Sequence, residues 1–149
     1  MKMKILLFGS QITIGGAQRV LLDQAEWFSS HGHEVIVVFY YDKDWLAKQW
    51  QQRYRFPIHT LTRYQQGKTL VNALRLPQAA SRLRGLIRSF QPDVIETFTH
   101  DANLIGLPVA ASAGVQVRVA AHHGQFKSLS ALRQKIHSAM INSANCDRL

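Results

Sequence analysis

The chain has one cysteine, few acidic residues and no long apolar run, and each scarcity excludes a class of protein. Its single cysteine, Cys146, cannot build a disulfide framework and fits a reducing compartment. The apolar run at residues 5–8 is too short for a secretion signal, and no stretch is long enough to span a bilayer. We therefore expect a cytoplasmic protein, with peripheral attachment to the inner face of the membrane left open.

Two phosphate-binding fingerprints are also absent. The pair Gly15-Gly16 is followed by Ala17 and Gln18, where a Walker loop needs Gly-Lys-Ser/Thr. Five residues separate Gly9 from Gly15, which is too many for the tight turn of the dinucleotide motif G-x-G-x-x-G. A nucleotide-dependent oxidoreductase is thus disfavoured, although it stays an alternative.

Nine acidic residues oppose 18 Lys and Arg, and the excess is concentrated. Ten of the 18 lie within residues 43–88 beside a single acid, Asp44, so this stretch carries the whole net charge of +9. Aromatic residues interleaved with cations are typical of surfaces that contact anionic lipid, and a solvated helix face is the alternative. Nucleic acid is the weaker partner, because no helix-turn-helix, zinc or ribonucleoprotein motif is present. The candidate membrane or polyanion residues are Trp45, Lys48, Trp50, Arg53, Arg82, Arg84 and Arg88.

With 149 residues, 46% of them apolar, the chain fits one domain with a sizeable core. Apolar runs predict strands at residues 4–8, 35–40, 57–61, 94–98 and 115–121. Helical periodicity appears after Ala17, briefly within residues 41–55, and over residues 67–90, 102–113 and 129–145, with Pro77 marking a start or kink. This alternation predicts an α/β fold, a Rossmann-like doubly wound parallel sheet in three layers.

In such a sheet, ligands bind beyond the carboxyl ends of the strands, where the strand order reverses. Residues 9–16, 97–103 and 122–126 fall there. The helix that follows Gly15 and Gly16 presents free amide N–H groups, which favour an anion, while the alternative is that the glycines only allow close helix packing. We expect no metal, because no ligand-spacing motif is present. The residues grouped on this rim are Gly15, Gly16, His100, Asp101, Asn103, His122 and His123.

Four motifs occur in order along the chain. They read Gly-Gly-Ala-Gln-Arg-Val from Gly15, Gly-His-Glu-Val from Gly32, Pro-Asp-Val-Ile-Glu from Pro92, and His-His-Gly from His122. Together they resemble the N-terminal domain of the GT-B glycosyltransferases of family 4. The likeness covers nearly the whole chain, and four motifs at matching intervals are far more specific than any one of them.

The resemblance implies transfer of a sugar from a nucleotide-sugar donor to a glycan or lipid-linked acceptor, in a cleft between two Rossmann-like domains and without a cofactor. It places Gly15 and Gly16 against the donor diphosphate or sugar. It gives His123 the catalytic position beside the reacting sugar, and it assigns His100, Asp101 and Asn103 to the acceptor side.

The chain departs from the family pattern in two side chains and in length. Gln18 stands where the family usually has Glu, and Glu96 stands where the strand often ends in His, so acceptor roles tied to those side chains are in question. The second domain, which in this family holds most of the nucleotide sugar, has no counterpart within residues 1–149. We therefore expect a single acceptor-side domain that does not catalyse alone.

Overall fold

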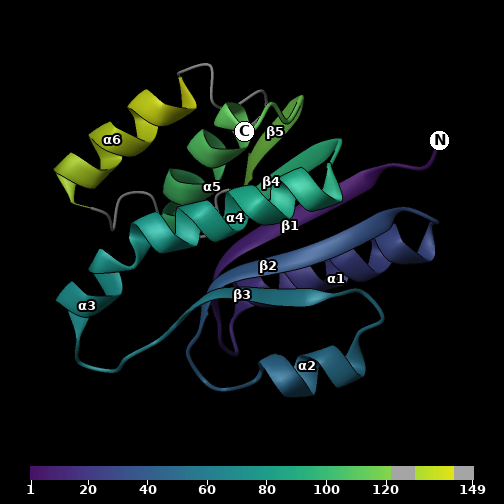
Figure 1. Ribbon diagram of the computed structural model, residues 1–149, viewed down its shortest axis with the longest axis horizontal. Helices are drawn as coiled ribbons and strands as arrows, with labels where there is room; N and C mark the ends of the chain where they lie inside the picture. Colours follow the sequence, from purple (N-terminus) through teal and green to yellow (C-terminus); the bar gives the residue numbers. More distant parts are fainter. Residues whose placement is uncertain (122–129, 143–149) are drawn as a thin grey trace.

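The computed structural model describes residues 1–121 and 130–142. Within them strands and helices alternate along the chain (Figure 1). The strands are β1 (Lys4–Ile12), β2 (Glu34–Asp42), β3 (Ile58–Arg63), β4 (Val94–Phe98) and β5 (Val117–Ala121). The helices are α1 (Gly16–Ser30), α2 (Ala47–Arg53), α3 (Thr69–Leu74), α4 (Leu76–Phe90), α5 (His100–Ser112) and α6 (Ala131–Ile141).

Strand β1 lies at the centre of the sheet, whose order is β3-β2-β1-β4-β5 with every pairing parallel. Phe8 of β1 is opposite Val38 on one side and Thr97 on the other. The chain builds outward from β1 to β3 and then returns to the far side of β1 with β4. The strand order therefore reverses between β1 and β4, which is where open α/β sheets form a ligand crevice.

Helices cover both faces of the sheet, because β1 and β2 are apolar on both sides. Leu6 and Phe8 point into a core shared with α4 and α5, whereas Ile5 and Leu7 point into a second core shared with α1 and α2. Helices α4 and α5 thus cover one face of the sheet and α1 and α2 cover the other, and Figure 1 shows α4 and α1 on opposite sides of the strands. The predicted three-layer, doubly wound parallel fold is confirmed.

Two differences from the predicted boundaries bear on the site. Strand β1 continues to Ile12, so Gly9 is a strand residue and not part of the rim, and a Cβ there would lie 2.6 Å from Phe39 Cε1. The predicted helical stretch over residues 67–90 is two helices, with Pro77 in the first turn of α4. Proline suits that position because the first-turn N–H needs no helical acceptor. The rim after β1 is thus only residues 13–15.

Two helical glycines provide a matched test of this packing. A Cβ at Gly106 of α5 would lie 2.6 Å from Phe8 Cδ1 and 2.6 Å from Thr97 Cγ2, whereas a Cβ at Gly85 of α4 meets nothing within 4 Å. We expect Gly106→Ala to lower the free energy of unfolding by about 1–3 kcal/mol through overpacking. Gly85→Ala should raise it by up to about 1 kcal/mol through helix propensity. Urea titrations measure both, and equal effects would contradict the close approach of α5 to β1.

Candidate functional site

The amino end of α1 lies at the reversal of strand order and is open to solvent. Gly15 is its N-cap, with no capping side chain, and the first turn holds no acidic residue. Gly16 is exposed, and a Cβ there would meet nothing within 4 Å. The unsatisfied first-turn N–H groups of a helix carry a partial positive charge, so this end suits an anion.

Neither glycine of the pair is required by a left-handed backbone. Gly15 is extended, with φ −165° and ψ 166°, and the glycines with positive φ are Gly32, Gly67 and Gly114. What the pair provides is the absence of a side chain above the helix end, which permits close approach of a ligand.

On the other side of the reversal, Thr99 is held in a strained conformation. Its φ of 76° and ψ of 163° belong to a region that β-branched residues almost never occupy. The backbone N–H of Thr99 donates to Ala121 O at 3.2 Å, and its hydroxyl donates to Ser10 Oγ at 3.1 Å. These bonds tie the ends of β1, β4 and β5 together, and sequence patterns gave no sign of Thr99.

A buried polar network fixes the start of α5. Asn103 is fully buried, and its amide orientation is assigned from its partners: Nδ2 donates to Thr97 O at 2.9 Å and Thr99 O at 3.1 Å, while Oδ1 accepts from His137 Nε2 at 3.1 Å. His137 comes from α6, so the network joins three elements. The ring of His100 packs beside that of His137, with centroids 4.9 Å apart.

The predicted acceptor-side residues therefore differ in accessibility. His100 and Asn103 are buried, whereas Asp101 is exposed in the first turn of α5. Asn103 supports the backbone from the interior, and Asp101 places a negative charge at this helix end. His122 and His123, the latter predicted to be catalytic, lie outside the described residues.

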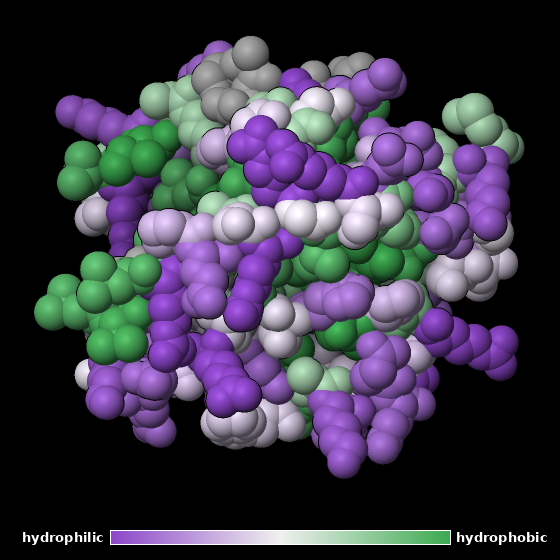
Figure 2. All heavy atoms as spheres, in the orientation of Figure 1, coloured by the Kyte–Doolittle hydropathy of each residue, from purple (hydrophilic) through white to green (hydrophobic). Residues whose placement is uncertain are grey.

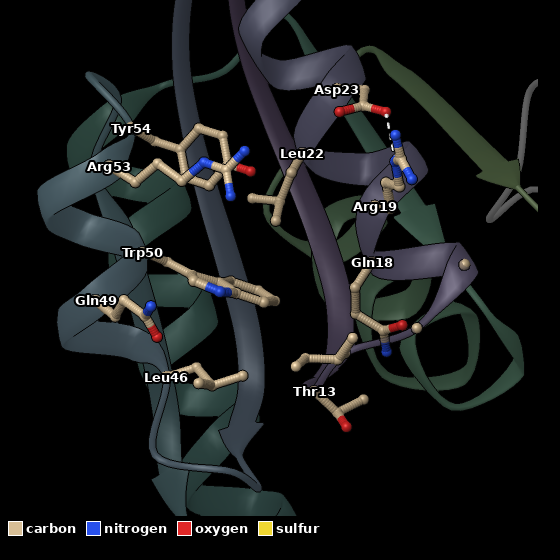
Figure 3. Close-up of a pocket in the computed structure, with 13 residues that line it drawn as sticks. Thr13, Gln18, Arg19, Leu22, Asp23, Leu46, Gln49, Trp50, Arg53 and Tyr54 are labelled. Atoms are coloured by element: carbon tan, nitrogen blue, oxygen red, sulfur yellow. Dashed lines mark ion pairs between the residues drawn. The ribbon is translucent and has the colours of Figure 1, made fainter.

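A groove of about 700 Å³ opens between α1 and α2 (Figure 3). One wall begins at Gly15 and Gly16 and continues along α1 to Asp23, and the other runs from Leu46 to Tyr54. The spacing of Leu46, Trp50 and Tyr54, four residues apart, brings all three to the same side of α2. The sequence predicted Trp50 and Arg53 as membrane or polyanion contacts, but it did not connect them with the glycine pair.

The predicted membrane residues do not form one surface. Lys48, Trp50 and Arg53 belong to α2, which packs on the same face of the sheet as α1. Arg82, Arg84 and Arg88 belong to α4, which packs on the other face (Figure 1). Arg82 donates to Leu61 O at 2.6 Å and Arg84 to Ser112 O at 3.1 Å, so both guanidinium groups bridge neighbouring elements. Trp50 packs against Phe39, with ring centroids 5.8 Å apart, whereas Trp45 is 77% exposed.

Among residues 1–121 and 130–142, no group of three or more His, Cys, Asp or Glu side chains is placed to hold a metal ion. In the same part of the chain, no helix is both long enough and apolar enough to cross a bilayer.

The two side chains that depart from the family pattern both have internal partners. Gln18 is buried, and its Nε2 donates to Gln11 O at 3.2 Å, which closes the turn after β1. Glu96 lies under α1, where it accepts a hydrogen bond from Gln24 Nε2 at 2.7 Å. Burial raises the pKa of the Glu96 carboxyl, and the bond from Gln24 opposes that rise.

Comparisons with known proteins agree with this geometry. The profile of glycosyltransferase family 4 matches residues 14–149. The chain belongs to glycosyltransferase family 4. The resemblance to the N-terminal domain of a family 4 GT-B enzyme is thereby confirmed. No match was found among curated protein sequences.

Solved structures share the fold at low sequence identity. HepE of Anabaena in complex with UDP is 18% identical, with a TM-score of 0.70 over 94% of this chain and 35% of that one. The lipopolysaccharide outer core galactosyltransferase WaaB is 13% identical, with a TM-score of 0.69 over 99% and 44%. MurG of Acinetobacter baumannii is 13% identical, with a TM-score of 0.66 over 92% and 39%. The chain thus spans less than half the length of each.

We expect the stability of this family 4 domain to depend on pH through Glu96. Because the folded state holds the carboxyl proton more tightly than the unfolded state, the stabilisation is present at low pH and lost as the pH rises through the raised pKa. We expect Glu96→Gln to raise Tm at about pH 8, with the difference shrinking towards about pH 4. Thermal unfolding of Glu26→Gln is the control, because Glu26 is exposed on α1 and its substitution removes the same negative charge. A gain that does not depend on pH would contradict this cause.

Proposed function

We propose that this chain is the acceptor-side domain of an enzyme that transfers a sugar from a nucleotide-sugar donor to a glycan or lipid-linked acceptor. The observation that carries the proposal is the amino end of α1, uncapped by any side chain, free of acidic residues and open above Gly16. It lies at the reversal of strand order in a domain of a glycosyltransferase family. The binding of UDP by HepE, which shares the fold, supports a nucleotide donor.

The chemistry of transfer fits this helix end. As the bond between sugar and diphosphate breaks, negative charge grows on the leaving diphosphate, and oriented N–H groups lower the barrier by stabilising that charge. Of the two helix ends that flank the reversal, α5 already carries Asp101 in its first turn, whereas α1 carries no acid there. The diphosphate therefore belongs at Gly15 and Gly16.

Substitution at Gly16 separates charge from size. We expect Gly16→Asp to lower kcat/KM for transfer about tenfold or more, because the carboxylate repels the diphosphate. The assay uses the polypeptide encoded by the longest reading frame that contains these residues. Asp and Asn match in size, so Gly16→Asn should lose less. The Asp variant should still unfold at or above the parent Tm, because an acid in the first turn of a helix is stabilising. Equal losses in both variants would contradict the assignment.

The 149-residue chain by itself should not turn over common nucleotide sugars, since we propose that most contacts to the donor come from a second domain. Release of nucleoside diphosphate in the presence of a glycan acceptor measures this. Clear turnover by the isolated chain would refute the proposal that a second domain supplies most contacts to the donor.

A second surface supports peripheral attachment to an anionic membrane. Leu70 and Leu74 of α3 are 82% and 80% exposed, and they follow the exposed Lys68. Leu132 and Ile136 of α6 are also exposed. Figure 2 shows two apolar groups at the same end of the molecule, one over α3 and one over α6. Exposed leucines beside cations are typical of surfaces that lie in the headgroup region.

Liposome flotation decides between this surface and the one predicted around Trp45. We expect the protein to float with vesicles that contain anionic lipid and not with neutral ones, since cations near the membrane contribute about 1 kcal/mol each. The double variant Leu70→Ser, Leu74→Ser should remain in the unbound fraction, whereas Trp45→Ser should float. Equal recovery with both vesicle types would contradict membrane attachment, and loss by Trp45→Ser alone would return the contact to α2.

A further inference from the structure

We infer that the groove between α1 and α2 binds the acceptor, and that the acceptor is a saccharide carrying a carboxylate or phosphate group. This inference rests on the proposed function, and it locates the acceptor away from the α5 side that the family pattern implied. The observations that carry it are the course of the groove, two aromatic rings held in place by the core, and an arginine with no carboxylate beside it.

The groove starts where the leaving diphosphate is proposed to lie. Its lining includes Gly15 and Gly16 at one end and extends along α1 past Leu22 to Asp23. A saccharide lying in it would therefore bring one end close to the sugar that is transferred. With a volume of about 700 Å³, the groove is in the range of small-molecule sites and has room for more than one sugar ring.

The aromatic rings of this groove are oriented by contacts with the core. Trp50 meets Phe39 edge to face at an interplanar angle of 61°, and Tyr54 stacks on Phe56 at 5.2 Å. In Figure 3 the indole of Trp50 extends from α2 across the groove towards Gln18. A sugar ring has an apolar face of C–H groups that packs on an aromatic ring, and a ring already held in place loses little entropy on binding.

Polar groups that suit sugar hydroxyls surround these rings. Gln49 lines the groove from α2 and is exposed, and its amide can both donate to and accept from sugar hydroxyls. Thr13 lines the groove from the turn after β1, and because its hydroxyl donates to Asp44 Oδ2, it is an acceptor for a ligand. Aromatic surface together with such groups is the lining expected of a saccharide site.

The charges of the groove favour an anion. Arg19 is paired with Asp23 at 3.7 Å, which leaves that pair neutral. Arg53 lies over the ring of Tyr54, 5.5 Å from its centroid, and in the described part of the chain no carboxylate is within ion-pair distance of it. Its planar guanidinium can therefore bind a carboxylate or a phosphate through two parallel hydrogen bonds.

The α5 side of the rim is less suited to the same ligand. Asp101 is the exposed member of the predicted acceptor group, and its negative charge would repel an acidic saccharide. His100 and Asn103 are buried. An acidic acceptor is thus attracted to the α2 side of the reversal and repelled from the α5 side.

Trp50 fluorescence tests the inference directly. In the Trp27→Phe, Trp45→Phe variant of the 149-residue chain, Trp50 is the remaining tryptophan. We expect saturable emission changes with a disaccharide ending in glucuronate or with glucose 1-phosphate, and about tenfold weaker binding of maltose, which lacks the charge-assisted bond. A response to glucuronate alone assigns a carboxylate, and a response to the phosphate alone assigns a phosphate.

The matched control is a neighbouring arginine outside the groove. Arg53→Gln should remove the preference for the acidic sugar, whereas Arg55→Gln makes the same change in net charge and should leave it intact. Equal binding of maltose and the acidic sugars, or equal effects of the two arginine variants, would overturn the inference. Trp50→Phe, which keeps a ring against Phe39, should weaken binding of all three sugars.

A separate readout distinguishes failure of the groove from failure of the proposed function. Slow hydrolysis of a nucleotide sugar without acceptor, by the polypeptide of the longest reading frame, reports on the donor alone. Hydrolysis without any sugar response at Trp50 overturns the groove assignment and leaves the proposed function standing. A sugar response at Trp50 without hydrolysis of the donor leaves the groove assignment standing and overturns the proposed function.

Discussion

Hydrogen bonding of β1 on both edges, with burial of both its faces, is the constraint on which the rest of the domain depends. Ile5, Leu6, Leu7 and Phe8 are each at most 2% exposed. A strand paired with β2 and β4 and covered by α1 and α5 cannot shift its register without turning every apolar side chain to the opposite face. The positions of both helix ends at the reversal of strand order follow from this one strand.

The two helix ends at that reversal are built differently, so that one is closed and the other is open to a ligand. The α5 end is closed by buried Asn103, by strained Thr99 and by an acid in its first turn. The α1 end has no capping side chain and no side chain above Gly16. Backbone strain persists only where the surrounding structure over-determines it, and the bonds from Thr99 to Ser10 and Ala121 do so here. The constrained amino end of α5 thus lies across the reversal from the open amino end of α1, whose free N–H groups carry a partial positive charge.

The basic stretch shows how sequence proximity can mislead. Within residues 43–88 the cations look like one surface, yet β3 separates α2 from α4 and the two helices lie on opposite faces of the sheet (Figure 1). Arg82 and Arg84 then bind backbone carbonyls of neighbouring elements, while Arg53 projects into the groove. Arginine thus stabilises packing on one face of the sheet and offers a binding group on the other face.

The sequence by itself determined the α/β class, the order of the elements and the family, because apolar periodicity and the four motifs are local properties of the chain. It also placed Gly15 and Gly16 at the amino end of the first helix. Only the tertiary structure joined that glycine pair to Trp50 and Arg53 in one groove, buried Asn103, and separated α2 from α4. Those outcomes depend on which strands pair and which faces helices cover, and such contacts link residues that lie tens of positions apart.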